Sequence, residues 1–251
     1  MTPGGHAVIT GASAGIGAAY ARALAGVCDS MLIVGRREDR LRALAEELAP
    51  GCRVVTAAAD LATLEGQARV VEAIRQGPPP ALLINNAGFS TLGPFAASDL
   101  DREREMLHLH GDANLALTRA ALPAMLAGER GAIINVASVA ALLALPGVAT
   151  YAATKAFLLS FSRSLRAELA GTGLRVQCLC PGYTRTEIHG RDTFAGFDAG
   201  RVPEDQWMTA EAVVAESLAA LEADRWLVVP GEHNRQLLVK AARELEAALD
   251  A

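Results

Sequence analysis

The feature that most limits what this chain can fold into is a regular alternation of short apolar runs and longer segments with helical periodicity. Each run is rich in Val, Ile and Leu and most of its positions are apolar, as expected of a strand buried on both faces. The runs cover residues 6–10, 31–35, 53–57, 82–85, 132–137, 175–179 and 226–229. Buried strands that are separated by helices form a parallel sheet with helices on both faces. The pattern therefore predicts an α/β fold with about seven strands.

A glycine cluster after the first run favours an open sheet over an eight-stranded barrel. Residues 10–17 have the sequence Thr-Gly-Ala-Ser-Ala-Gly-Ile-Gly and lead into a helix expected over residues 18–25. Glycines there permit a tight turn, and the helix N-terminus offers free N–H groups to a pyrophosphate. An ordinary strand-to-helix turn is the alternative. We expect one single-domain, Rossmann-type, doubly wound parallel sheet over residues 1–251.

Composition excludes several classes of partner. The formal net charge is −5 and no basic run occurs, which argues against a nucleic acid or an anionic membrane as partner. The first residues lack the basic flank and apolar core of a signal peptide, and no apolar stretch reaches membrane-spanning length. The four cysteines have neither disulfide-framework nor zinc spacing. We expect a cytoplasmic protein.

The end of the second apolar run indicates which dinucleotide is bound. Gly35, Arg36 and Arg37 stand where a fold that prefers NAD places an acid for the ribose hydroxyls. Gly35 leaves room and Arg36 supplies positive charge, which suits the 2′-phosphate of NADP. We therefore predict NADP(H) over NAD(H). The alternative is a solvated arginine pair at the start of an Arg/Glu-rich helix.

A hydroxyl, a phenol and an ammonium are candidates for the chemistry. Tyr151 and Lys155 are four residues apart on a predicted helix, so their side chains share one face, and Ser138 follows the fifth run. A fixed ammonium beside a phenol favours the phenolate and lowers the phenol's pKa from about 10. Such a set suits proton transfer to a ketone oxygen while another group delivers hydride.

Together these motifs resemble the short-chain dehydrogenase/reductase family, in its compact class. They occur in the family's order and with similar gaps over about residues 8–231. The matching stretches are residues 10–17, Asp60-Leu61, Asn85-Asn86-Ala87-Gly88, Ser138, Tyr151-Ala152-Ala153-Thr154-Lys155 and residues 181–186. Each motif alone is weak, whereas the ordered set is specific.

The resemblance implies a site for NAD(H) or NADP(H) and a role for each catalytic residue. In the reductive direction Tyr151 donates the proton, Lys155 lowers the pKa of Tyr151, and Ser138 orients the carbonyl. The cofactor supplies the hydride. The implied cofactor contacts are Gly11, Ser13, Gly15, Ile16, Gly17, Arg36, Asp60, Leu61, Asn85, Gly88, Tyr151, Lys155, Pro181, Gly182, Thr184 and Thr186.

The chain departs from the family at His110. The family usually has a catalytic Asn thirteen residues before a Leu-Pro step, and counting back from Pro123 gives His110. A neutral imidazole can also donate and accept, so His110 is a candidate to hold a water or relay a proton. A buried histidine with no catalytic part is the alternative, and Asn114 is a further candidate to replace the missing amide. His108 and His110 project to different helix faces, so no metal site is expected.

The substrate side is expected to be apolar. Residues 139–145 would form its wall. Tyr183 and residues 187–207, with Phe194, Phe197 and Trp207, would form a lid as in relatives. This lining suits a hydrophobic ketone or aldehyde better than a sugar or a small acid. Packing of these residues against the sheet edge is the alternative.

We therefore predict an NADP(H)-dependent ketone or aldehyde reductase, assembled as a homodimer or homotetramer. Two other readings stay open because His110 replaces the usual Asn. One is a nucleotide-binding or regulatory protein on the same fold, and the other is a biosynthetic enzyme with non-redox chemistry.

Overall fold

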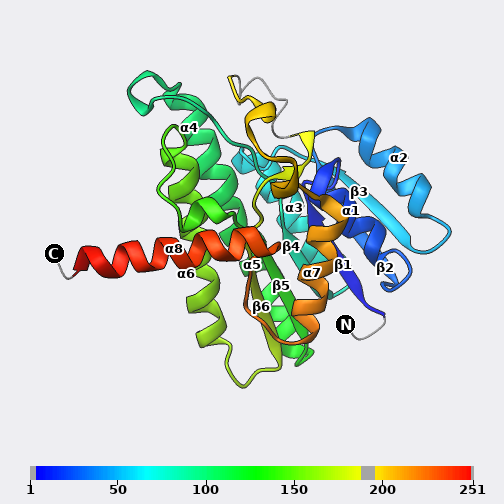
Figure 1. The fold of residues 1–251 in the computed structure, drawn as a ribbon. Helices are drawn as coiled ribbons and strands as arrows, with labels where there is room; N and C mark the ends of the chain where they lie inside the picture. Colours follow the sequence, from blue (N-terminus) through cyan, green and yellow to red (C-terminus); the bar gives the residue numbers. More distant parts are fainter. Residues whose placement is uncertain (1–3, 188–195, 250–251) are drawn as a thin grey trace.

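The computed structural model describes residues 4–187 and 196–249, and its main element is one parallel seven-stranded sheet (Figure 1). The strand order is β3-β2-β1-β4-β5-β6-β9. The strands are β1 (His6–Thr10), β2 (Ser30–Gly35), β3 (Arg53–Ala58), β4 (Pro80–Asn85), β5 (Gly131–Val136), β6 (Leu174–Leu179) and β9 (Leu227–Val228). Each predicted run lies within two residues of its strand. The doubly wound, Rossmann-type sheet is confirmed.

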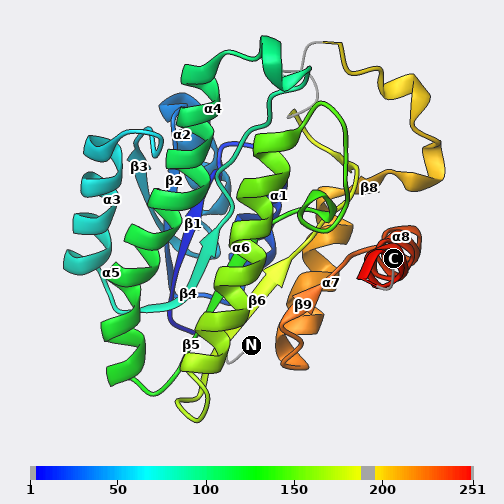
Figure 2. The same cartoon turned by 90° about the vertical axis from the view of Figure 1, so that its left-hand side faces the viewer.

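Helices cover both faces of the sheet (Figures 1 and 2). One face packs against α1 (Gly15–Leu24), α2 (Glu38–Leu48) and α7 (Ala210–Glu222). The other packs against α3 (Leu64–Gln76), α5 (Ala113–Ala127) and α6 (Ala149–Glu168). Each fully buried Val, Leu, Ile or Met side chain contributes about 1.5–3 kcal/mol to the stability of the fold, so the two cores hold the strand ends rigidly in place.

The strand order creates a crevice at the carboxyl edge of the sheet, where the parallel strands end. β1 pairs with β2 on one side and with β4 on the other, so the chain reverses its direction of growth across the sheet between β3 and β4. Ligands of open α/β sheets bind outside the carboxyl ends of the strands at such a point. The glycine-rich residues 10–17 and the turn at residues 85–88 both lie at this edge.

Two features of the backbone are not predicted by the apolar pattern. Strands β7 (Thr184–Arg185) and β8 (Met208–Thr209) form a separate ladder that is too short to show periodicity. Between α4 (Leu100–Leu107) and α5 the helix widens into one π-turn at His108–Asp112, closed by the Ala113 N–H on the His108 carbonyl. Such turns are often found at functional sites.

The last helix, α8 (Glu232–Leu249), extends away from the sheet, with the C-terminus near its far end (Figures 1 and 2). Along its exposed length Val239 is 53% exposed. The start of α8 lies close to the strand ends. No described helix combines the length and the hydropathy that crossing a bilayer requires.

Candidate active site

A cavity of about 1020 Å³ opens at the carboxyl edge of the sheet and brings most of the predicted site residues together. Its size suits a ligand larger than an ordinary drug-sized molecule. The predicted residues that line it are Gly11, Ser13, Gly15, Ile16, Arg36, Asp60, Leu61, Gly88, Ser138, Tyr151, Lys155, Pro181, Gly182, Thr184 and Thr186. Gly17, Asn85 and His110 are outside this lining and lie behind it.

The glycine-rich turn has the backbone that a phosphate cradle needs. Gly11 and Gly15 have φ of +68° and +55°, and a β-carbon on Gly11 would lie 2.7 Å from the Asn86 amide nitrogen. A β-carbon on Gly17 would lie 2.4 Å from the Gly11 carbonyl oxygen, so Gly17 serves the packing of α1 on the turn. Ala14 at the N-cap of α1 makes no side-chain cap, which leaves the N–H groups of the first turn available to an anion. The turn fits a dinucleotide.

Two arginines flank this cradle beyond β2. The Arg37 guanidinium donates to the Ser13 hydroxyl at 3.2 Å and pairs with the Glu187 carboxylate at 2.6 Å. Arg36 lies 3.8 Å from the Asp60 carboxylate. A β-carbon on Gly35 would be 3.3 Å from the Ser13 hydroxyl, so Gly35 keeps this corner open. The sequence singles out Arg36, whereas it is Arg37 that reaches the glycine-rich turn.

Asn85 does not face the cavity. Its amide nitrogen donates to the Asn135 oxygen at 2.9 Å and to the Thr118 hydroxyl at 3.2 Å, within a buried polar network that continues to Ser162. The next residue, Asn86, lines the cavity and donates to the Thr10 carbonyl at 2.8 Å. Strand alternation explains the difference, because neighbouring side chains point to opposite faces.

Tyr151, Lys155 and Ser138 meet at the floor of the cavity. The Lys155 Nζ lies 5.5 Å from the Tyr151 ring centroid and donates to the Val136 carbonyl at 2.9 Å. Ser138 caps a short 3₁₀ turn, where its hydroxyl accepts from the Ala140 N–H at 3.1 Å. The three side chains come from the end of β5 and from one face of α6, as predicted.

Burial dominates the electrostatics of this group. Tyr151 is partly open to the cavity, yet desolvation raises the pKa of its phenol above 10, and the hydrogen bond with Ser138 opposes that rise. Burial also lowers the pKa of Lys155 from 10.5 to about 8. In the protein by itself the pKa of Tyr151 is thus shifted opposite to the predicted lowering, because loss of hydration outweighs the Ser138 hydrogen bond.

His110 lies directly behind the cavity wall and is fully buried. Its Nδ1 is 2.8 Å from the Thr154 hydroxyl, and its ring packs edge-on against Tyr151 with centroids 5.9 Å apart. Desolvation, and then the Lys155 ammonium, hold the pKa of His110 well below its usual range. Asn114, one turn on, donates to the Leu109 and His110 carbonyls and so serves the backbone of the π-turn. No group of three or more potential metal-binding side chains gathers within residues 4–187 and 196–249.

The outer part of the cavity is mainly apolar. Phe89, Leu92, Leu143, Val148 and Phe197 line it, together with the predicted Tyr183. The Tyr183 ring stacks against Phe197 and packs at a tilt against Trp207, with ring centroids 5.9 and 5.4 Å away. Phe194 of the predicted lid lies outside the described residues.

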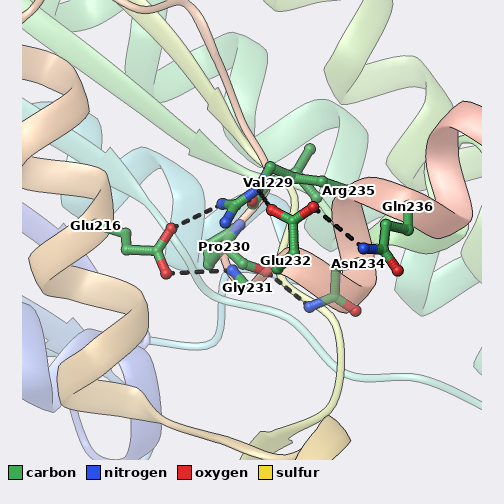
Figure 3. Close-up of polar contacts among 8 residues, drawn as sticks. All are labelled: Glu216, Val229, Pro230, Gly231, Glu232, Asn234, Arg235 and Gln236. Carbon is green, nitrogen blue, oxygen red and sulfur yellow. Dashed lines mark hydrogen bonds and ion pairs between the residues drawn. The ribbon is translucent and has the colours of Figure 1, made fainter.

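The start of α8 also lines the cavity, through His233, Asn234 and Leu237. Figure 3 shows how it is anchored: Glu216 of α7 accepts from the Gly231 N–H and from Arg235, each at 3.2 Å. The Asn234 amide donates to the Pro230 carbonyl at 2.7 Å (Figure 3). A β-carbon on Gly182 would lie 2.2 Å from the Asn234 oxygen, so α8 closes against this loop. The apolar pattern of α8 gives no signal for this contact.

Comparison with known proteins agrees with this geometry. Residues 5–193 match the short chain dehydrogenase family. Sulfoacetaldehyde reductase 2 of Chromohalobacter salexigens is 38% identical over 72% of this chain and 73% of its own length. A short chain dehydrogenase of Pseudocercospora fijiensis is 36% identical over 75% of this chain, which is 62% of that longer protein.

Two solved structures share the fold over nearly the whole chain. A short-chain dehydrogenase from Sphingobium yanoikuyae in complex with NADPH has a TM-score of 0.86 and 33% identity, over 97% of this chain and 95% of its own. A bulky-bulky ketone specific alcohol dehydrogenase from Comamonas testosteroni has a TM-score of 0.81 and 28% identity, over 97% and 94%. The chain therefore belongs to the short-chain dehydrogenase/reductase family of NAD(P)-dependent oxidoreductases.

Proposed function

We propose that this protein is an NADP(H)-dependent carbonyl reductase that acts on a hydrophobic ketone or aldehyde. One observation carries the proposal: Tyr151, Lys155 and Ser138 lie in the same cavity as a glycine-rich phosphate cradle, beneath a mainly apolar outer wall. The activity and the cofactor type of the family fix the reaction class, whereas the substrate and the cofactor preference rest on the residues of this chain.

In reduction, the Ser138 hydroxyl orients the substrate carbonyl and Tyr151 donates a proton to its oxygen. The raised pKa of Tyr151 keeps the phenol protonated at neutral pH, which is the form that reduction requires. With a pKa of about 8, Lys155 is still an ammonium at pH 7 and stabilises the negative charge that Tyr151 gains. When bound, the nicotinamide supplies hydride to the carbonyl carbon.

Selectivity for NADP(H) is proposed to come from both arginines beyond β2. Arg37 is held against Ser13 at the glycine-rich turn, and Arg36 stands beside it at the rim of the cavity. A planar guanidinium matches phosphate geometry, and the acid that would bind ribose hydroxyls is replaced here by arginine. The Sphingobium relative was solved in complex with NADPH, which agrees with this preference.

The proposed substrate class follows from the outer wall. Its aromatic and aliphatic side chains suit a bulky apolar ketone, in line with the name of the Comamonas enzyme. The name of the Chromohalobacter relative points instead to a small anionic aldehyde. In this chain the Glu105 carboxylate lies 2.7 Å from Arg102 on the cavity rim, and its negative charge opposes the approach of a sulfonate there. We therefore favour the apolar substrate.

The test is NADPH oxidation, followed with aryl and cyclic ketones, with sulfoacetaldehyde, and with Tyr151→Phe as the control. We expect turnover with the apolar ketones, weaker turnover with sulfoacetaldehyde, and none above background in the variant. NADPH binding without turnover on any carbonyl would instead favour a nucleotide-binding protein. Product formation without oxidation of NADPH would favour non-redox chemistry.

A homo-oligomer, a dimer more than a tetramer, and a cytoplasmic location complete the proposal. Leu115 of α5 and Phe157 of α6 are large apolar side chains that are 42% and 38% exposed on adjacent helices, which supports a subunit contact there. The four cysteines are free thiols, as a reducing compartment would keep them. Light scattering coupled to size exclusion tests the assembly, and a monomer would contradict it.

A further inference from the structure

Two buried side chains behind the cavity are not assigned a role by the reaction described above. They are His110, in the π-turn, and Thr154, one residue before Lys155 on α6. His110 is fully buried and Thr154 is 3% exposed. The His110 Nδ1 lies 2.8 Å from the Thr154 Oγ1, which in turn lies 2.8 Å from the Tyr151 carbonyl oxygen.

These two distances fix where the protons are. A carbonyl oxygen only accepts, so the Thr154 hydroxyl must donate its single proton to the Tyr151 carbonyl. The same hydroxyl can then only accept from His110, and Nδ1 must carry a proton. Burial keeps the ring neutral, which leaves Nε2 unprotonated. The geometry selects one of the two neutral tautomers.

The unprotonated nitrogen faces the catalytic side. The His110 Nε2 lies 2.7 Å, and the Lys155 Nζ 3.6 Å, from the point where a β-carbon on Gly88 would be. The two nitrogens are therefore at most about 6.3 Å apart, a separation that one water molecule hydrogen-bonded to both can span. Within the described residues Nε2 has no hydrogen-bond partner, although it is fully buried. A buried acceptor in this state requires a donor.

We propose that Thr154 is a positioning residue: it holds His110 as the Nδ1–H tautomer, so that Nε2 is a permanent acceptor for the Lys155 ammonium through one bridging water. This inference rests on the proposed reductase function and deepens it. The pair replaces the asparagine that the family has at this position, and it keeps the ammonium oriented toward Tyr151 without itself gaining a proton.

The neighbours of the ring support this assignment. The titratable groups that face the ring are Tyr151 and Lys155, both from α6. Cys178 and Cys180, on the β6 side, interact electrostatically with Lys155. Phe89 closes another side, with ring centroids 6.4 Å apart. None of these groups is a carboxylate that would favour a protonated ring.

Nitrogen-15 NMR of histidine-labelled protein tests the tautomer directly and needs no activity. We expect His110 to show a protonated Nδ1 and an unprotonated Nε2 in the wild type and in Thr154→Ser. Thr154→Val, which keeps the shape but removes the hydroxyl, should give a mixture of tautomers. A wild-type signal from the Nε2–H tautomer would overturn the proposal, and so would a Thr154→Val spectrum like that of the wild type.

Kinetics test the functional half. Thr154→Val should lower kcat for ketone reduction at least tenfold and change the pH profile of kcat, while NADPH affinity stays within about twofold of the wild type. Thr154→Ser, which keeps the hydroxyl, should restore most of the lost kcat. Ser162→Ala is the matched control, since it removes another buried α6 hydroxyl that donates to a carbonyl one turn earlier, at Leu158. Equal effects of Thr154→Val and Ser162→Ala on kcat would overturn the proposal.

These outcomes separate the two proposals. If none of the carbonyls tested supports NADPH oxidation by the wild-type protein, the proposed function fails. The NMR result still decides the tautomer in that case. Should Thr154→Val not fold, the wild-type and Thr154→Ser spectra decide it.

Discussion

Replacing His110 by Asn should change how the free energy of unfolding depends on pH. In the folded protein burial, and then Lys155, hold the His110 pKa well below 6.5, whereas the unfolded chain titrates near 6.5. The unfolded state therefore binds the extra proton, and wild-type stability falls as the pH drops through 6.5. Because the ring stays neutral in the folded protein, protonation of His110 in the unfolded chain lowers the free energy of unfolding. The loss is about 1.4 kcal/mol at pH 5.5 and about 0.2 kcal/mol at pH 7.0.

Asn does not titrate, so the stability of His110→Asn relative to the wild type should rise by about 1.2 kcal/mol between pH 7.0 and 5.5. Urea unfolding at both pH values and one protein concentration measures it, and the same change in a chain of this length moves Tm by roughly 2–5 °C. His6 is also buried with a lowered pKa, but it is common to both proteins and cancels. The control is His233→Asn, the same substitution at an exposed position. If the difference in stability between His110→Asn and the wild type did not change with pH, the conclusion that His110 is a buried neutral ring would be refuted.

Three further outcomes are expected. Arg37→Leu should raise the Kd of NADPH about tenfold or more and leave the Kd of NADH unchanged, because it removes a charge-assisted contact with the 2′-phosphate of about 1.5–3 kcal/mol. Fluorescence titration measures both Kd values. Since Lys155 loses its proton as the pH rises through about 8, kcat/KM for reduction should fall on that side, and a flat profile from pH 7 to 9 would contradict the assignment. Gly88→Ala should destabilise the protein by about 1–3 kcal/mol in urea unfolding, because the new β-carbon would lie 2.7 Å from the His110 Nε2.

Most of the fold can be predicted because its determinants are local. Strands buried on both faces are mostly apolar, and the glycines after β1 show where the chain must turn sharply. The π-turn at His108–Asp112 has no such local signal, and it lies where α4 and the turn itself pack against α6. Likewise, nothing in the amphipathic pattern of α8 indicates that its first turn lies against Gly182.

The site shows the same division. Spacing alone places Tyr151 and Lys155 on one face of α6, and the strand ends bring Ser138 to them. Which of two adjacent residues faces the cavity depends on strand register, so Asn86 lines it while Asn85 bonds within the interior. The direction of the Tyr151 pKa shift could not be predicted either, because desolvation depends on all the atoms around the ring.

The π-turn explains why a histidine can stand where the family has an amide. Widening the helix disturbs the usual pairing of carbonyl groups, and the Asn114 side chain donates to two of them, at Leu109 and His110. Its donor is therefore used by the backbone of the π-turn. Within the described part of this turn, the His110 ring is the polar side chain that reaches the back of the cavity. The buried Nε2 of this ring has no partner within the described residues, which is why the Thr154 hydroxyl that sets its protonation matters for function.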